Sequence, residues 1–204
     1  MSPTLVSIFV YLYGLVGSLY AAICLLRVLL QLSRANYYNP ISQFIVKATQ
    51  PVTKVLRSFI PTWKRLDLAG VAWCLLFQLI AIELAALILL QTFINPVLAL
   101  SWGAIGLLSL LISIFYFGMI VLIIASVATL LGGAPIRHPA LDLLTQIMAP
   151  VLQPLQRLIP PIGGLDLSPI LLFVFLNVCR IILMNLENAA GLLGGSRVLV
   201  PGLF

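Results

Sequence analysis

The sequence contains an internal duplication: the segment 40–68 recurs without a gap as 139–167, ninety-nine positions further along. The matched positions are prolines, aliphatic residues and one aspartate in each copy. They pair as Pro40 with Pro139, Pro51 with Pro150, Val52 with Val151, Leu56 with Leu155, Ile60 with Ile159, Pro61 with Pro160, and Leu66-Asp67-Leu68 with Leu165-Asp166-Leu167. Long apolar runs flank each copy. Because a repeat fixes the architecture, the sequence predicts one membrane unit used twice.

The composition excludes an ordinary soluble domain. Hydrophobic residues make up 62% of the chain and charged residues 8%, whereas a soluble domain is about 25% charged. Four apolar runs approach or exceed the roughly 20 residues that cross a bilayer. They cover Leu5–Leu30, Leu68–Leu90, Ile105–Leu131 and Ser168–Met184. The sequence therefore predicts an all-α membrane protein with four transmembrane helices.

The distribution of positive charge predicts the orientation of these helices. Cations gather between the first and second runs, and Arg137 and Arg157 lie between the third and fourth. The connection 91–103 carries no charged residue. By the positive-inside rule, both repeated segments face the cytoplasm and both termini are periplasmic. The two units then form parallel tandem repeats in a bacterial inner membrane, related by an axis along the membrane normal.

These boundaries divide the chain into a first repeat over residues 1–95, a second repeat over 96–190 and a C-terminal tail over 191–204. No Lys or Arg precedes the first apolar run, which is longer than the roughly 7–15-residue core of a secretory signal. We therefore expect the first helix to stay in the mature protein.

The first repeated segment has the pattern of an amphipathic helix. From Ile41 to Phe59, apolar residues recur at spacings of three and four, which predicts a single apolar stripe. Asn39 before Pro40 is a helix-start signal. Pro51 predicts a kink or a break, because proline removes an internal hydrogen bond and clashes with the preceding turn.

The second segment follows the same pattern, with His138 in place of the asparagine and with Pro150 and Pro154 as interruptions. Such helices either lie among the lipid headgroups or pack as short re-entrant pieces against the spanning helices. The basic polar side of the first copy favours the headgroup region, because each cation near an anionic leaflet contributes about 1 kcal/mol. The predicted membrane-surface cations are Lys47, Lys54, Arg57, Lys64 and Arg65.

A proline and an aspartate close each repeated segment. Pro61 and Pro160 end the amphipathic stretch, and Asp67 and Asp166 stand directly before the next apolar run. An aspartate at that point can cap the coming helix and meets its positive dipole end. We interpret both aspartates as helix caps, with binding of a cation or a partner as the alternative.

Two charges fall inside predicted membrane helices. Glu83 lies roughly 22 Å from the cytoplasmic end of the second helix, and Arg180 roughly 17 Å into the fourth. A charge at the centre of a span costs about 2.5–3.5 kcal/mol, so we predict that the two pair in the bundle interior. A proton or ion pathway is the alternative. Arg27, near the end of the first helix, can snorkel to the interface.

The chain lacks the residue sets of common catalytic and metal sites. His138 is the sole histidine, so no bis-histidine haem site, zinc site or catalytic triad is expected. No Walker loop, dinucleotide fingerprint or nucleophile elbow occurs. Cys24, Cys74 and Cys179 lie in separate apolar runs, where thiols behave as small hydrophobes. The sequence predicts no enzyme, no cofactor, no metal and no nucleic-acid partner.

The duplicated pattern resembles the YggT family of small integral membrane proteins, which includes plastid relatives. The resemblance covers about Tyr20 to Leu186 and rests on Asn39-Pro40-Ile41, Pro51, Leu56, Ile60-Pro61, Asp67-Leu68 and their counterparts up to Leu167. It implies no settled molecular activity. Bacterial members are associated with osmotic-stress tolerance and with cell division or envelope processes, and plastid members with cytochrome b6 haem assembly and nucleoid organisation. The resemblance implies a scaffold or assembly factor.

We therefore expect a non-enzymatic scaffold or assembly factor at the cytoplasmic leaflet. Its expected partners are anionic lipid headgroups and either other membrane proteins or further copies of itself. The alternative is a small channel or transporter in osmotic adaptation, with Glu83 and Arg180 lining its path. A conduction path needs a polar stripe, and apart from a few residues such as Gln78 and Asn177 the predicted spans are apolar. This pattern favours the scaffold.

Overall fold

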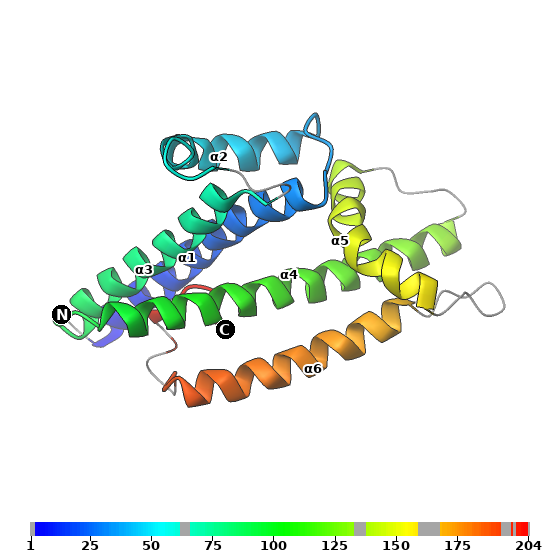
Figure 1. The fold of residues 1–204 in the computed structure, drawn as a ribbon. Helices are drawn as coiled ribbons and strands as arrows, with labels where there is room; N and C mark the ends of the chain where they lie inside the picture. Colours follow the sequence, from blue (N-terminus) through cyan, green and yellow to red (C-terminus); the bar gives the residue numbers. More distant parts are fainter. Residues whose placement is uncertain are drawn as a thin grey trace.

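Six α-helices occur in the computed structural model, which describes residues 3–61, 66–132, 138–158, 168–192, 197 and 199–203 (Figure 1). In chain order they are α1 (Pro3–Leu32), α2 (Pro40–Leu56), α3 (Leu68–Leu89), α4 (Pro96–Gly132), α5 (Pro139–Leu158) and α6 (Ser168–Ala189). The helices α1, α3, α4 and α6 are long and apolar enough to cross a membrane. The prediction of an all-α, multi-pass membrane protein is therefore confirmed.

Asparagine followed by proline starts two of these helices. In α2, Asn39 Oδ1 accepts a hydrogen bond from the Ile41 N–H at 2.9 Å, as the sequence predicts. In α4, Asn95 Oδ1 accepts one from the Val97 N–H at 3.0 Å. This second cap explains why α4, at 37 residues, begins well before the predicted Ile105.

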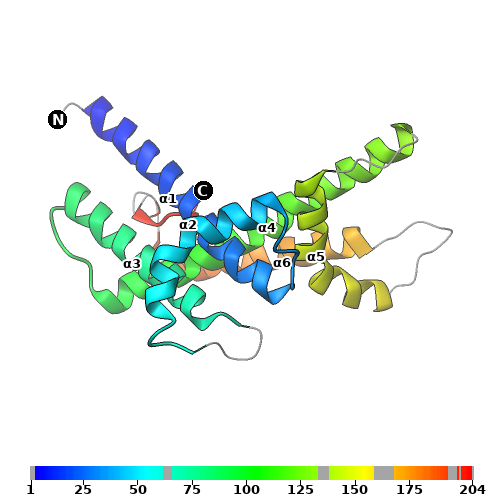
Figure 2. The same cartoon turned by 90° about the horizontal axis from the view of Figure 1, so that it is seen from above.

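The helices α2 and α5 lie at the same end of the four long helices, which we call the α2/α5 end (Figure 1). α2 packs against α1 and α3, and α5 packs against α4 and α6. Pro51 lies inside α2, and Pro150 and Pro154 lie inside α5. Both helices change direction along their length (Figure 2), but the predicted breaks do not interrupt them. Buried residues before and after Pro51, Ile45 and Thr53, hold α2 on the bundle.

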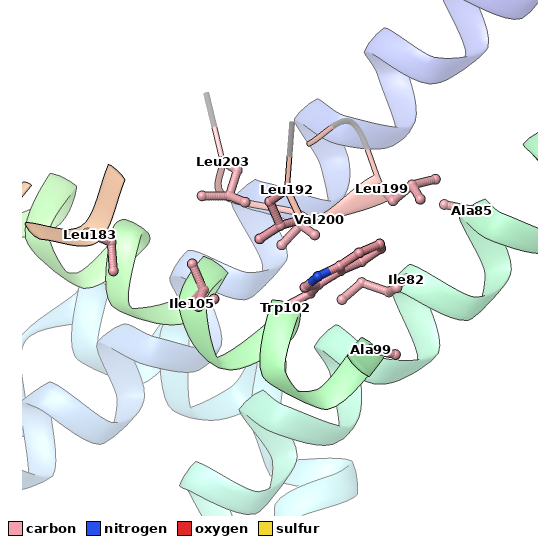
Figure 3. Packing of buried hydrophobic residues seen from close by; sticks show 10 residues of the cluster. All are labelled: Ile82, Ala85, Ala99, Trp102, Ile105, Leu183, Leu192, Leu199, Val200 and Leu203. Atoms are coloured by element: carbon pink, nitrogen blue, oxygen red, sulfur yellow. The ribbon is translucent and has the colours of Figure 1, made fainter. Parts of the chain in front are cut away.

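The bundle is organised around α4, which packs most extensively against α3 and α6, while α1 packs mainly against α3. A core cluster joins these helices to the C-terminal tail. Trp102 of α4 and Ile82 of α3 lie near Leu199 and Val200 of the tail, and Leu203 belongs to the same cluster (Figure 3). All five side chains are buried. The tail is thus part of the bundle core, which the sequence did not predict.

Hydrogen bonds to two helices hold the tail in place. Gln78 Nε2 of α3 donates to the Pro201 carbonyl oxygen at 2.8 Å, and the Gly202 N–H donates to Ser18 Oγ of α1 at 2.8 Å. Gly202 has φ +96° and lies against the backbone of Gly106, so a side chain there would be strained. Gln78 and Ser18, two buried polar side chains of the bundle, therefore bond to the tail backbone.

Candidate functional site

A buried cluster of charged side chains lies where α1, α2 and α3 meet. Arg27 comes from α1, Arg57 directly follows α2, and Asp67 directly precedes α3. Arg57 Nη2 donates to Asp67 Oδ2 at 2.5 Å, and Arg27 Nε lies 3.7 Å from the same oxygen. The Asp67 side chain is fully buried, that of Arg27 is 7% exposed, and that of Arg57 is 42% exposed. We call these three residues the arginine–aspartate cluster.

Arg27 also links α1 to the inner side of α2. Its Nη1 donates to Thr49 Oγ1 at 2.7 Å and to the Val46 carbonyl oxygen at 3.1 Å. The Thr49 hydroxyl in turn donates to the Ile45 carbonyl oxygen at 2.7 Å. A buried charge is costly unless it is paired and hydrogen-bonded. These contacts keep Arg27 inside the protein, so the expected snorkelling does not occur.

Asp67 stands at the N-cap position of α3, but its side chain makes no capping hydrogen bond. Asp67 thus occupies the predicted N-cap position without the predicted capping hydrogen bond. The carboxylate instead accepts charge-assisted bonds from Arg57, which are stronger than bonds to neutral N–H groups. Burial raises the pKa of Asp67, but the Arg57 hydrogen bond, the nearby Gly70 N–H and the charges of Arg57 and Arg27 hold the pKa below its ordinary value.

The polar lining of this site belongs to the first repeat. On the ninety-nine-residue offset, the buried polar residues of α2 correspond to apolar residues of α5: Ser42 to Leu141, Thr49 to Met148, and Thr53 to Leu152. Met148 is fully buried beside Gly118 of α4. Its counterpart in the first repeat, Thr49, instead accepts a hydrogen bond from Arg27. The two copies share a helix start but differ in their inner faces.

The outer surfaces of α2 and α5 also differ. Phe44, Val55 and Phe59, from the predicted apolar stripe of the first copy, are exposed. They are exposed because α2 turns its serine and threonine side to α1, together with Ile45 at the edge of the stripe, so that the rest of the stripe points away. In α5, Leu143 and Ile147 are buried in a core cluster that includes residues of α1. Only the first copy thus leaves an apolar surface uncovered within the described residues.

The starts of α2 and α5 are joined to each other. Asn39 Nδ2 donates to the Pro139 carbonyl oxygen at 2.7 Å, and the Asn36 N–H donates to Gln146 Oε1 at 2.7 Å. Residues of both helix starts line a cavity of about 570 Å³. We call α2, α5 and residues 33–39, which connect α1 to α2, the α2–α5 platform. Lys47 of α2 and Gln146 of α5 therefore lie at the same end of the bundle.

Glu83 and Arg180 do not form an ion pair in the structure, although both are described. Glu83 Oε2 accepts the Ile94 N–H at 3.2 Å, which fastens the connection to α4. Arg180 is exposed and lines a cavity of about 100 Å³ together with Glu187, which is paired with Arg197. Since α4 packs against both α3 and α6, it separates the two charges. The depth of a residue along its helix did not reveal this lateral arrangement.

The remaining predicted site residues lie on or next to α2 and α5. Pro40 and Pro139 are the first residues of these two helices, and Pro61 lies beyond the end of α2. Lys47 and Lys54 are exposed on α2. Four other predicted residues, Lys64, Arg65, Pro160 and Asp166, lie outside the described residues.

Sequence reasoning missed Arg27 as a member of the site and missed the polar side of α2. Ser42, Thr49 and Thr53 are spaced by seven and four residues, which places them on one side of a helix. That spacing, beside a separate apolar stripe, was the available signal for a polar partner. Chemically, two guanidinium groups around a single carboxylate leave N–H donors for an anion. Among the described residues, no three His, Cys, Asp or Glu side chains gather as metal ligands.

Comparison with known proteins identifies the family of this chain. The CCB3/YggT family model matches two segments, residues 6–88 and 101–186, as expected for two repeats. An uncharacterized protein of Pseudomonas aeruginosa is 39% identical, with 91% of each chain covered. The uncharacterized protein YggT of Escherichia coli K12 is 33% identical, over 95% of this chain and 96% of its own length. No solved structure matches the chain. With two matched segments and relatives aligned over nearly their whole length, this chain belongs to the CCB3/YggT family.

Proposed function

We propose that this protein is a non-enzymatic scaffold or assembly factor of the bacterial inner membrane, and that it works through the α2–α5 platform at the cytoplasmic leaflet. The observation that carries the proposal is the joining of α2 to α5 through Asn39–Pro139 and Asn36–Gln146. These bonds make one surface from both repeats. The family resemblance associates such a role with envelope, cell-division or osmotic-stress processes.

The charges on the platform support a cytoplasmic position. Lys47 and Lys54 are exposed on α2, and Arg57 follows at its end. The positive-inside rule places such cations on the cytoplasmic side. In that orientation α1 begins and α6 ends at the periplasmic side, and the tail turns back from there into the bundle. The exposed apolar stripe of α2 then rests on lipid while its cations face the headgroups.

The bundle interior supports a scaffold over a channel. Leu199, Val200 and Leu203 of the tail fill the space between the long helices, and Gln78 and Ser18 are engaged by the tail backbone. A conduction path needs polar groups free to face water. In this protein, Gln78 and Ser18 form hydrogen bonds with the tail backbone rather than facing a water-filled path.

Site-specific photo-crosslinking in native membranes tests the scaffold role. A benzophenone amino acid is placed at Lys47 or Lys54 on α2, and at exposed Thr92 in the connection at the opposite end as the matched control. We expect discrete crosslinked protein products from the platform positions and none from Thr92. Smears or empty lanes at both platform positions would contradict the proposal.

Flux measurements test the alternative. The purified protein in liposomes should give no more ion flux than protein-free liposomes. Robust flux that Glu83→Gln abolishes would replace the scaffold with a channel, and the same measurement on Arg180→Gln would show whether that residue shares the path.

A further inference from the structure

The arginine–aspartate cluster opens onto a cavity that the scaffold role does not use. This cavity, of about 260 Å³, lies between α1 and α2 and is lined by Arg27, Gln31, Tyr37, Ser42 and Arg57, among others. Arg27 lies five residues before the end of α1, so it is about 8 Å below that end at 1.5 Å per residue. A helix of 30 residues is about 45 Å long, and a bilayer with its headgroups is about 40–45 Å thick around a hydrocarbon core of about 30 Å. If α1 spans such a bilayer, Arg27 lies near the boundary between headgroups and acyl chains.

Two buried polar atoms on this cavity lack a hydrogen-bond partner within the described residues. One is Ser42 Oγ, on a residue that is 2% exposed. The other is Arg27 Nε, on a residue that is 6% exposed; this atom is ion-paired with Asp67 Oδ2 at 3.7 Å but makes no hydrogen bond. Leaving a buried donor unsatisfied carries a desolvation cost. A ligand that accepts hydrogen bonds from both groups would remove that cost.

The charge of the cavity selects an anion. Arg27 and Arg57 carry two positive charges and Asp67 carries one negative charge, so the cluster is left with one net positive charge. Each guanidinium has five N–H donors, and Asp67, Thr49 and Val46 use only some of them. Guanidinium groups match phosphate oxygens in geometry, and basic pockets between transmembrane helices on the cytoplasmic side bind anionic headgroups.

The second repeat has different residues at two positions of this site. The position of Ser42 is leucine there, and that of Arg57 is glutamine. Packing of a helix at this place therefore does not by itself explain the buried serine of the first repeat.

We propose that this cavity binds the phosphate group of an anionic phospholipid, with Arg27, Arg57 and Ser42 as its donors. The apolar residues Leu30, Ala35 and Val46 also line the cavity, and Phe44 and Val55 of α2 are exposed. These apolar groups can contact acyl chains, which is why a lipid rather than a soluble phosphate is the ligand. This inference goes beyond the scaffold role; it shares with it only the cytoplasmic position proposed for the α2/α5 end.

Native mass spectrometry of the delipidated full-length protein in neutral detergent tests the site, with phosphatidylglycerol as the probe. We expect saturable binding that Arg57→Gln weakens at least about tenfold, because a hydrogen bond to a charged group is lost. Ser42→Leu, which installs the second-repeat residue, should abolish binding by filling the cavity. Lys47→Gln removes the same charge from the exposed side of α2, outside the cavity, and should weaken binding much less than Arg57→Gln does.

Several results would overturn the proposal. Equal losses in Arg57→Gln and Lys47→Gln would mean that surface charge alone attracts the lipid. Phosphatidylcholine binding as tightly as phosphatidylglycerol would remove the requirement for a net negative charge. If inorganic phosphate bound as tightly as the lipid, the acyl chains would contribute nothing, and the ligand would not need to be a phospholipid. If Ser42→Leu does not fold, Ser42→Ala replaces it. That change removes a hydroxyl that is hydrogen-bonded to none of the described residues, and it should weaken lipid binding while circular dichroism stays unchanged.

Discussion

At the scale of single residues, the buried Arg27 and Asp67 define how α1, α2 and α3 fit together. Arg27 is held by Asp67 on one side and by Thr49 and Val46 on the other. A buried ion pair adds little net stability, but removing one partner leaves an uncompensated buried charge. Replacing one partner alone should therefore lower the stability of the protein much more than replacing both partners together.

Asp67→Asn should lower the free energy of unfolding by about 3 kcal/mol, because Arg27 then remains buried without its counter-ion. Adding Arg27→Met should recover most of that loss, since a buried pair exchanged for groups of similar volume is often neutral. Thermal unfolding in detergent measures both changes, with Asp142→Asn on the exposed side of α5 as control. A single variant as stable as the parent protein would show that the pair does not form.

The lowered pKa of Asp67 predicts how stability depends on pH. An aspartate whose folded-state pKa is below its unfolded value of about 3.9 stabilises the fold above that pH. The contribution is lost as pH falls through the folded-state pKa. The stability difference between the parent protein and Asp67→Asn should thus be constant from pH 7 to about 5 and shrink below about 4. Unfolding curves across this range check the prediction, and a difference that grows on acidification contradicts it.

At the scale of elements, α2 and α5 show how one repeated pattern produced two kinds of helix. α2 turns its serine and threonine side to α1, so Phe44 remains exposed, whereas α5 buries Leu143 and Ile147 against its neighbours. The difference follows from the residues at the inner positions, since Arg27 offers hydrogen bonds to α2 and nothing comparable is described beneath α5.

A spin label on α2 should report this orientation. In a variant with Cys24, Cys74 and Cys179 replaced by alanine, a label at Phe44→Cys should be accessible to oxygen, which concentrates in lipid. A label at Gln50→Cys, on the opposite polar side of the same helix, should be accessible to a water-soluble nickel complex. Power-saturation electron paramagnetic resonance measures both accessibilities, and identical profiles would contradict an interfacial α2.

At the scale of the whole molecule, the long helices enclose the tail. Leu199 is 3% exposed between the helices. A cysteine at Leu199 should therefore react slowly with a membrane-impermeant maleimide, whereas one at Thr92 should react fast. Gly106→Leu should raise the reactivity of the Leu199 cysteine, because a Cβ at Gly106 already lies 2.5 Å from Val200 Cγ1. Fast reaction in the parent background would place the tail outside the bundle.

Sequence reasoning succeeded where local signals decide the outcome. The lengths of the apolar runs gave the four long helices, and Asn39-Pro40 gave the start of α2. It did not succeed for contacts between distant segments. Asp67 was interpreted by its neighbours in sequence as a cap, because its arginine partners can be recognised only after α2 is oriented on α1. The pairing of Glu83 with Arg180 was proposed from depth alone, without the position of α4 between their helices.

The burial of Leu203 has a practical consequence for handling this protein. A purification tag joined near Leu203 would compete with residues 199–203 for the space between the long helices and for the hydrogen bonds to Gln78 and Ser18. A tag placed before α1 avoids this competition, because the start of α1 extends away from the other helices (Figure 2).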